Sequence, residues 1–197
     1  MSSEKHASPS TKILLGIIVL VAASRIPNAG GYTPWANFSS IGAMALFGGA
    51  YLNKFWKALV FPLLALLLSD ICISTIVFQG RYGILYSGWY FIYGIFLIIV
   101  ILGRRMLKEL STRNIVMAGL CAALLHWILS DYTVWVGGGK DLRTMQPLAH
   151  NWQGLMQCYI QGFPFFKNFL FGTWIYSAIM FGAFEWMKKY RPKLAFV

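Results

Sequence analysis

Long apolar runs follow one another along most of this chain, separated only by short polar or glycine-rich segments. A helix needs about 20 apolar residues to cross a bilayer, so a chain of 197 residues, with its connecting loops, has room for roughly six or seven such helices. Charged residues make up 12% of the chain and hydrophobic residues 58%, whereas a soluble domain is about a quarter charged. The sequence therefore predicts a small integral membrane protein. It excludes a large extramembrane domain and a soluble enzyme anchored by a helical hairpin.

The apolar runs predict an all-α fold, a compact bundle of six transmembrane helices. We expect these helices over residues 13–24, 38–52, 58–78, 84–102, 115–136 and 164–186. The chain then divides into a flexible cytoplasmic tail (1–12), a six-helix transmembrane domain (13–187) and a basic cytoplasmic tail (188–197). The first run is short and also fits a signal peptide cleaved near residue 23. It is therefore interpreted either as the first transmembrane helix or as a signal peptide.

Glycine and proline residues give further expectations about single elements. The second run is rich in glycine and alanine, which allow helices in lipid to approach closely. Pro62 is expected to bend the third helix near its start. Pro164 suits the first turn of the last helix, so the connection before it is expected to extend from 137 to about 158. This connection begins with GGGK at 137–140, which is expected to be a flexible lid or hinge over the outer face.

Lysine and arginine are distributed unevenly between the two sides of the six-helix map. Of the 17 basic residues, 12 fall on the side that holds both termini and 5 on the other. Basic residues collect in cytoplasmic loops, so we expect both termini in the cytoplasm and the protein in a bacterial inner membrane. This topological explanation of the positive charge also argues against a nucleic-acid partner.

Polar and ionisable groups within the expected helices gather near their outer ends. Such groups are costly in a membrane and usually face a cavity or one another. We predict an outward-facing, aromatic-walled substrate site formed by Arg25, Asn37, Asp70, Tyr86, Trp89, Asp131, Tyr132, Trp135, Lys167 and Asn168. The same charges have a structural interpretation, in which the two aspartates pair with Arg25 and Lys167 and hold helices together. The tripeptide Leu-Ser-Asp occurs at 68–70 and again at 129–131, which is consistent with a duplicated hairpin.

No cofactor and no catalytic residue is expected. The GGGK segment lacks the spacing of a phosphate-binding loop, so active transport would need a partner protein or an ion gradient. His126 and Ser130 lie four residues apart on one helix face, but no nucleophile elbow accompanies them. The three cysteines show no metal-ligand spacing. An intramembrane enzyme would need His126 or Cys72 for its activity.

Several segments resemble a group of small bacterial six-helix proteins related to the S components of energy-coupling factor transporters. The resemblance rests on Arg25-Ile-Pro, Asn37-Phe-Ser, Ala45-Leu-Phe-Gly-Gly-Ala, Pro62, Ser69-Asp70 and Pro164-Phe-Phe-Lys-Asn. It implies an S-component-like bundle that binds a vitamin or related micronutrient near the outer leaflet and docks on a coupling protein with ATPases. The Ala-x-x-x-Ala docking pattern of many S components is absent from the first helix, which leaves a solitary S-like protein open. Some solitary relatives handle cobalamin through a cysteine ligand to cobalt, and Cys72 is placed for that role.

The leading hypothesis is a substrate-binding and uptake protein for a micronutrient, with the lipid bilayer and a small-molecule substrate as partners. The alternative is a membrane assembly or interaction protein without a small-molecule substrate, in which the charges only join helices.

Overall fold

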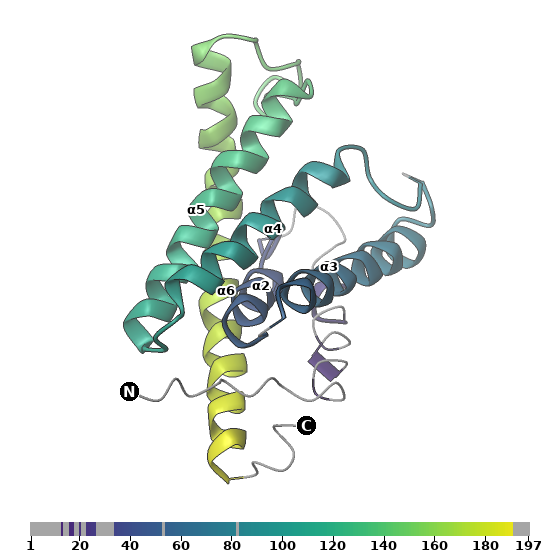
Figure 1. Ribbon diagram of the computed structural model, residues 1–197. Coiled ribbons are helices and arrows are strands. Elements are labelled where there is room, and N and C mark those ends of the chain that lie inside the picture. Colours follow the sequence, from purple (N-terminus) through teal and green to yellow (C-terminus); the bar gives the residue numbers. More distant parts are fainter. Residues whose placement is uncertain are drawn as a thin grey trace.

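The structure is a computed structural model that describes residues 13, 16–17, 20, 23–26, 34–52, 54–81 and 83–190. Its regular elements are all helical (Figure 1). They are α2 (Ile41–Tyr51), α3 (Phe55–Cys72), the π-helical turn η2 (Ile73–Val77), α4 (Trp89–Met106), α5 (Thr112–Val136) and α6 (Trp152–Tyr190). The all-helical prediction is confirmed for this part of the chain. The predicted first helix lies largely outside the described residues.

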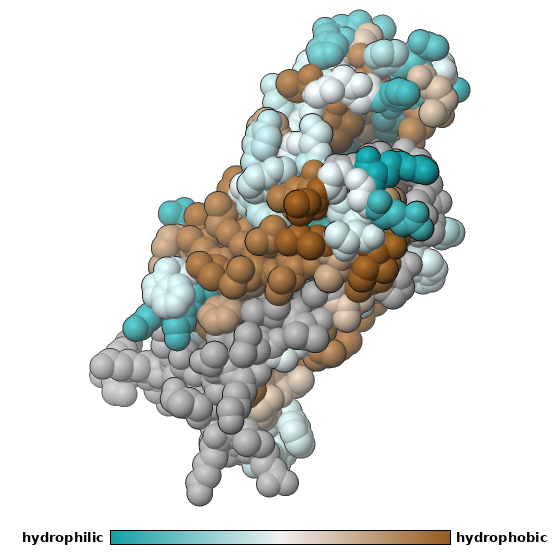
Figure 2. Space-filling view, turned by 90° about the vertical axis from the view of Figure 1, so that its right-hand side faces the viewer, coloured by the Kyte–Doolittle hydropathy of each residue, from teal (hydrophilic) through white to brown (hydrophobic). Residues whose placement is uncertain are grey.

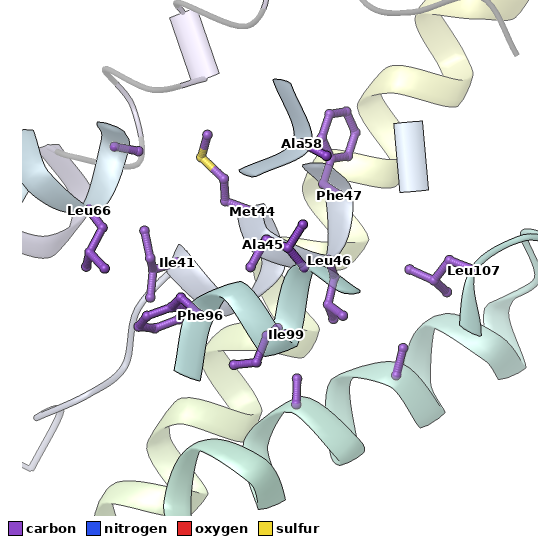
Figure 3. Close-up of a cluster of buried hydrophobic side chains, with 14 of the residues drawn as sticks. Ile41, Met44, Ala45, Leu46, Phe47, Ala58, Leu66, Phe96, Ile99 and Leu107 are labelled. Carbon is purple, nitrogen blue, oxygen red and sulfur yellow. The ribbon is translucent and has the colours of Figure 1, made fainter. Parts of the chain in front are cut away.

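Helix α2 is at the centre of the fold, and α3, α4, α5 and α6 all contact it (Figure 1). Ten of its 11 residues are buried, because their side chains pack between the surrounding helices. Figure 3 shows Met44 and Leu46 of α2 in one apolar cluster with Ile99 of α4. A helix of 11 residues rises about 17 Å, well short of a hydrocarbon core of about 30 Å. The span predicted over 38–52 is thus a short buried helix.

Glycines allow α2 and α4 to cross with their backbones in contact. A Cβ atom on Gly49 would lie 2.3 Å from the carbonyl oxygen of Val100, and one on Gly103 would lie 2.8 Å from that of Leu46. Neither position has room for a side chain, so the crossing depends on both glycines. The close approach predicted from the small residues of this segment is confirmed.

Three helical segments among the described residues are long and apolar enough to cross a membrane, namely 55–77, 89–106 and 112–136. Large apolar side chains such as Leu64, Ile98 and Ile128 are exposed on their outer faces. Figure 2 shows a hydrophobic band across the middle of the molecule, with hydrophilic residues gathered at one end. Apolar surface of this extent matches lipid rather than water, so the structure indicates a membrane protein. The count of six spans stays a prediction, because the last predicted span lies within α6, which is not among these three segments.

Helix α6 differs most from the prediction. It begins at Trp152, where the Asn151 side chain accepts a hydrogen bond from the backbone N–H of Gly154 at 2.9 Å and so caps the first turn. The expected start near Pro164 is wrong, and the connection before α6 covers 137–151 rather than extending to 158. Pro164 lies inside the helix, where it removes one backbone hydrogen bond without ending the helix. At the other end, α6 continues to Tyr190, so the first residues of the expected tail are helical.

Helix α4 also starts later than the expected residue 84. Gly83 and Gly88 both have left-handed backbone conformations, with φ angles of 83° and 81°, and the segment between them is irregular. The helix therefore begins at Trp89. This irregular segment brings Tyr86 to the end of the molecule where the candidate site lies.

Candidate functional site

A cavity of about 780 Å³ lies where the ends of several helices meet. Its wall consists of the last turns of α3 with η2, the start of α4, the second half of α5 and the first half of α6, together with Arg25 and the segment before α2. The α3–α4 and α5–α6 connections put all these ends on the same side of the fold. The buried part of the wall includes Asp70, Phe96 and Phe169, whereas Tyr86 and Lys140 are exposed at its rim.

An ion pair occupies one side of the cavity wall. The Arg25 guanidinium donates to Oδ1 of Asp70 at 2.7 Å, and the Asp70 side chain is only 4% exposed. Arg25 also donates to the Ser69 hydroxyl, and Tyr93 of α4 donates to Oδ2 of Asp70 at 3.1 Å. Both carboxylate oxygens of Asp70 therefore have partners. This contact joins Arg25 to α3 and α4, as expected if the charges hold helices together.

Asp131 lies on α5 in a different environment. Its Oδ2 atom is buried and has no hydrogen-bond partner among the described residues. The Trp127 and Ser130 side chains of the same helix interact with the carboxylate, but neither reaches hydrogen-bond geometry with this oxygen. A Cβ atom on Gly162 of α6 would lie 1.7 Å from Oδ2. The carboxylate thus occupies the space that any larger residue at position 162 would fill.

Aromatic rings form much of the wall between α4, α5 and α6. The His126 imidazole stacks on Phe169, with ring centroids 4.3 Å apart and planes 10° from parallel, and Phe96 lies 5.6 Å away. Phe165 also lines the cavity. The Ser130 hydroxyl donates to the backbone carbonyl of Trp127 at 3.4 Å, and no hydrogen bond joins Ser130 to His126 in the described structure. The pair therefore shows no hydrogen bond that would let His126 activate the Ser130 hydroxyl as a nucleophile.

The connection between α5 and α6, at the top of Figure 1, contributes Lys140 and Leu142 to the rim. Gln161 of α6 makes two hydrogen bonds to the backbone of this connection. Its side-chain nitrogen donates to the Lys140 carbonyl at 2.8 Å, and its side-chain oxygen accepts from the Leu142 N–H at 3.1 Å. The Trp135 indole N–H donates to the Ala149 carbonyl at 2.9 Å. The connection that begins with the expected flexible lid or hinge is therefore anchored to both helices.

Two groups near the rim have shifted pKa values. Hydrogen bonds from Arg143, whose guanidinium lies 2.7 Å from the carboxylate, lower the pKa of Asp141, whose side chain is 13% exposed. Part of Tyr86 reaches solvent, yet desolvation of its hydroxyl, followed by the negative charge of Asp70, raises the pKa well above the usual range. Tyr86 is thus a protonated hydrogen-bond donor at the rim.

Residues 5–194 match the model of DUF6580, which is described as a family of unknown function. The chain belongs to the DUF6580 family. No curated protein and no solved structure matches the sequence.

The cavity of this DUF6580 protein contains half of the residues that were predicted to bind substrate. Those on its wall are Arg25, Asn37, Asp70, Tyr86 and Asp131. The structure brings them together from five separate parts of the chain. Their role in binding stays a prediction.

The other predicted binding residues do not line this cavity, and most have internal partners. Asn168 donates hydrogen bonds to the carbonyls of Pro34 and Ala36, both at 2.8 Å, and so holds the segment before α2. The Trp89 ring packs edge-on against Tyr93, with centroids 5.1 Å apart. The remaining three contact neighbouring aromatic rings: Tyr132 lies against Trp135, Trp135 against His150, and the Lys167 ammonium over Phe163.

Cys72, the candidate cobalt ligand, lies on α3 and does not line the cavity, whereas Cys158 does. The described residues contain no group of three or more histidine, cysteine or acidic side chains able to hold a metal ion. Cys158 donates a hydrogen bond to the Asp131 carbonyl at 3.3 Å, so the thiol contributes to the α5–α6 contact.

Sequence reasoning did not predict several wall residues of the DUF6580 cavity as binding residues. Cys158 falls at the end of the expected connection, Gln161 lies before the expected helix start at Pro164, and Phe165 and Phe169 lie in the expected last helix without a predicted role. The signal that identifies them is a run of residues facing α5 at helical spacing. It becomes visible only once the helix is known to start at Trp152.

Proposed function

We propose that this protein is a membrane-embedded binding protein that captures a small molecule, a vitamin or related micronutrient, at the outer face of a bacterial inner membrane for uptake. One observation carries the proposal: a cavity of about 780 Å³ with a mixed aromatic and charged wall. Sites for small organic ligands are typically about 300–1,000 Å³, mostly apolar, with a few polar groups that orient the ligand. A purely structural contact between helices needs no such space.

The distribution of basic residues supports the outward orientation of this cavity. The α2–α3 and α4–α5 turns lie at the opposite ends of the helices. These turns and the helix ends beside them carry Lys54, Lys57, Arg104, Arg105, Lys108 and Arg113. The C-terminus of α6, with Lys188 and Lys189, lies on that side as well. In the proposed topology of six spans, this basic side faces the cytoplasm.

Uptake of the captured molecule needs a source of energy, and no nucleotide-binding motif is present in the sequence. We propose that a separate membrane partner supplies it, such as a coupling protein with ATPases of the kind that serves S components. The bound molecule would leave toward the cytoplasm only when the protein is docked on that partner.

The alternative, a membrane assembly protein without a ligand, is favoured by a specific observation. The Arg25–Asp70 pair and the two hydrogen bonds of Asn168 use predicted binding groups as internal contacts. Such contacts explain why those residues are polar. They do not explain the cavity, or why the Oδ2 atom of Asp131 is buried without a hydrogen-bond partner among the described residues.

Depletion of nutrients from the growth medium tests the proposal. Bacterial cells that overproduce the protein are compared with cells that produce Ser130→Phe, which places a bulky ring in the cavity, and medium compounds are followed by untargeted mass spectrometry. We expect at least one vitamin-like compound to disappear faster with the wild-type protein only. Identical depletion by both strains, at equal protein levels in the membrane, would contradict the proposal.

A further inference from the structure

The charged groups of the cavity wall do not balance one another. Arg25 and Asp70 neutralise each other through their 2.7 Å contact. Lys140 is exposed at the rim, where solvent screens its charge. Asp131 remains as the carboxylate with a buried oxygen and no cationic partner among the described residues. A buried carboxylate is stable only when a cation or a proton compensates it.

The nearby basic side chains of the described structure are engaged elsewhere. Lys167, which the sequence offered as a partner of Asp131, places its ammonium over the Phe163 ring at 5.6 Å. Arg143 pairs with Asp141 in the connection between α5 and α6. The protein itself therefore supplies no counter-charge to Asp131 from these positions, and a ligand in the cavity is able to supply one.

We infer that the ligand carries a cationic nitrogen that pairs with Asp131, and an aromatic or apolar body that packs against the rings of the wall. This inference rests on the proposed binding function. An ammonium or aromatic nitrogen cation forms charge-assisted hydrogen bonds with a carboxylate. The faces of aromatic rings also attract cations, and Phe96, Phe165 and Phe169 lie on the same wall.

The contact between α5 and α6 holds the carboxylate in place for this role. Gly162 leaves room for Oδ2 beside the α6 backbone, and Cys158 fixes the adjacent carbonyl of Asp131. An aspartate whose only function was to join the helices would have its own donor on α6. Here the position opposite the carboxylate is a glycine, which has no side chain to donate.

The competing chemistry is a protonated Asp131 that binds a neutral ligand through one hydrogen bond. The two cases differ in their response to Asp131→Asn. Asparagine keeps the shape and the ability to hydrogen-bond, but it removes the charge. A cationic ligand loses affinity on this change, whereas a neutral one does not.

Three probes that share a ring system and differ in charge test the inference: 2-naphthylmethylammonium, 2-naphthylmethanol and 2-naphthoate. Their affinities are measured by calorimetry on the full chain in lipid nanodiscs, with empty nanodiscs as the correction for partition into lipid. We expect the cation to bind about tenfold more tightly than the alcohol, and Asp131→Asn to abolish this preference. Glu109→Gln, which removes an exposed charge at the opposite end of the fold, should leave the preference unchanged.

Asp131→Glu, which retains the charge, should retain the preference for the cation even if Asp131→Asn folds poorly. Equal or tighter binding of the alcohol or the carboxylate would overturn the inference while leaving the cavity as a binding site. Co-purification of a neutral or anionic compound with the wild-type protein would also overturn the inference and leave the cavity as a binding site. If no probe binds and no compound co-purifies, the proposed binding function fails together with the inference.

Discussion

Asp70 and Asp131 each follow a Leu-Ser pair toward the end of a helix, and their carboxylates have different surroundings. Asp70 receives hydrogen bonds from Arg25 and Tyr93 on its two oxygens. Asp131 faces a glycine, and its Oδ2 atom has no hydrogen-bond partner among the described residues. In α3 the tripeptide Leu-Ser-Asp thus contributes an aspartate to an internal ion pair. In α5 it places on the cavity wall an aspartate that has no cationic partner among the described residues.

Asp70→Asn should destabilise the protein. The substitution leaves the Arg25 guanidinium partly buried without its counter-charge, which costs about 3 kcal/mol in comparable buried pairs. We expect a clearly lower midpoint of thermal unfolding in detergent. The double variant Arg25→Gln/Asp70→Asn should recover part of the loss, and no recovery would show that the two residues act independently.

Asp131→Asn should behave in the opposite way in the absence of ligand. Asparagine has the same shape, and it removes a charge that the described residues do not compensate. Its unfolding midpoint should equal or exceed that of the wild type. A loss as large as that of Asp70→Asn would mean that the Asp131 carboxylate has a structural partner after all.

The sequence predicted that these charges gather at one end of the fold, and the cavity contains Arg25, Asp70 and Asp131. It left open which charges pair. Pairing depends on the rotation of each helix about its axis, and the surroundings of Lys167 illustrate this. Its position on α6 directs the ammonium over Phe163 rather than toward Asp131.

Among the elements, the crossing of α2 and α4 depends on glycine at two positions. Gly103→Ala should destabilise the protein by about 2 kcal/mol, because the added methyl would lie 2.8 Å from the backbone oxygen of Leu46. Gly94 lies on the same helix with open space around it, so Gly94→Ala is the matched control. It should be neutral or stabilising by less than about 1 kcal/mol. Equal unfolding midpoints for the two variants would contradict this crossing.

The connection between α5 and α6 depends on Gln161 for two of its backbone contacts. Gln161→Leu removes both hydrogen bonds while keeping a side chain of similar size. Hydrogen exchange of the Leu142 amide should accelerate about tenfold, and amides within α4 should be unaffected. Unchanged exchange at Leu142 would indicate that other contacts hold this segment.

Helix α6 shows why the start of a helix was not predictable from local sequence alone. Proline is common in the first turn of a helix, and the sequence-based prediction placed Pro164 there. The structure nevertheless continues the helix through it, because a proline inside a helix costs one backbone hydrogen bond and the long contact with α5 compensates for it. Tertiary packing of this kind is not visible in local sequence, whereas the apolar helices α3, α4 and α5 were predicted within a few residues.

For the whole molecule, the proposed topology puts the cavity and the basic turns on opposite sides of the membrane. In a variant without the native cysteines, Lys140→Cys should react with a membrane-impermeant maleimide in intact spheroplasts. Glu109→Cys, in the α4–α5 turn, should react only after the membrane is permeabilised. The reverse labelling pattern would show that the protein has the opposite orientation in the membrane, with the cavity on the cytoplasmic side.

The central claim is that the cavity holds a small molecule, and native mass spectrometry of the full chain released from lipid nanodiscs tests it most directly. The account predicts a one-to-one adduct of a non-lipid compound on the wild-type protein and on Glu109→Gln. This adduct should be absent from Ser130→Phe. If the wild-type protein, purified from cells grown in nutrient-rich medium, shows only lipid adducts that Ser130→Phe shares, the claim of a binding site is contradicted.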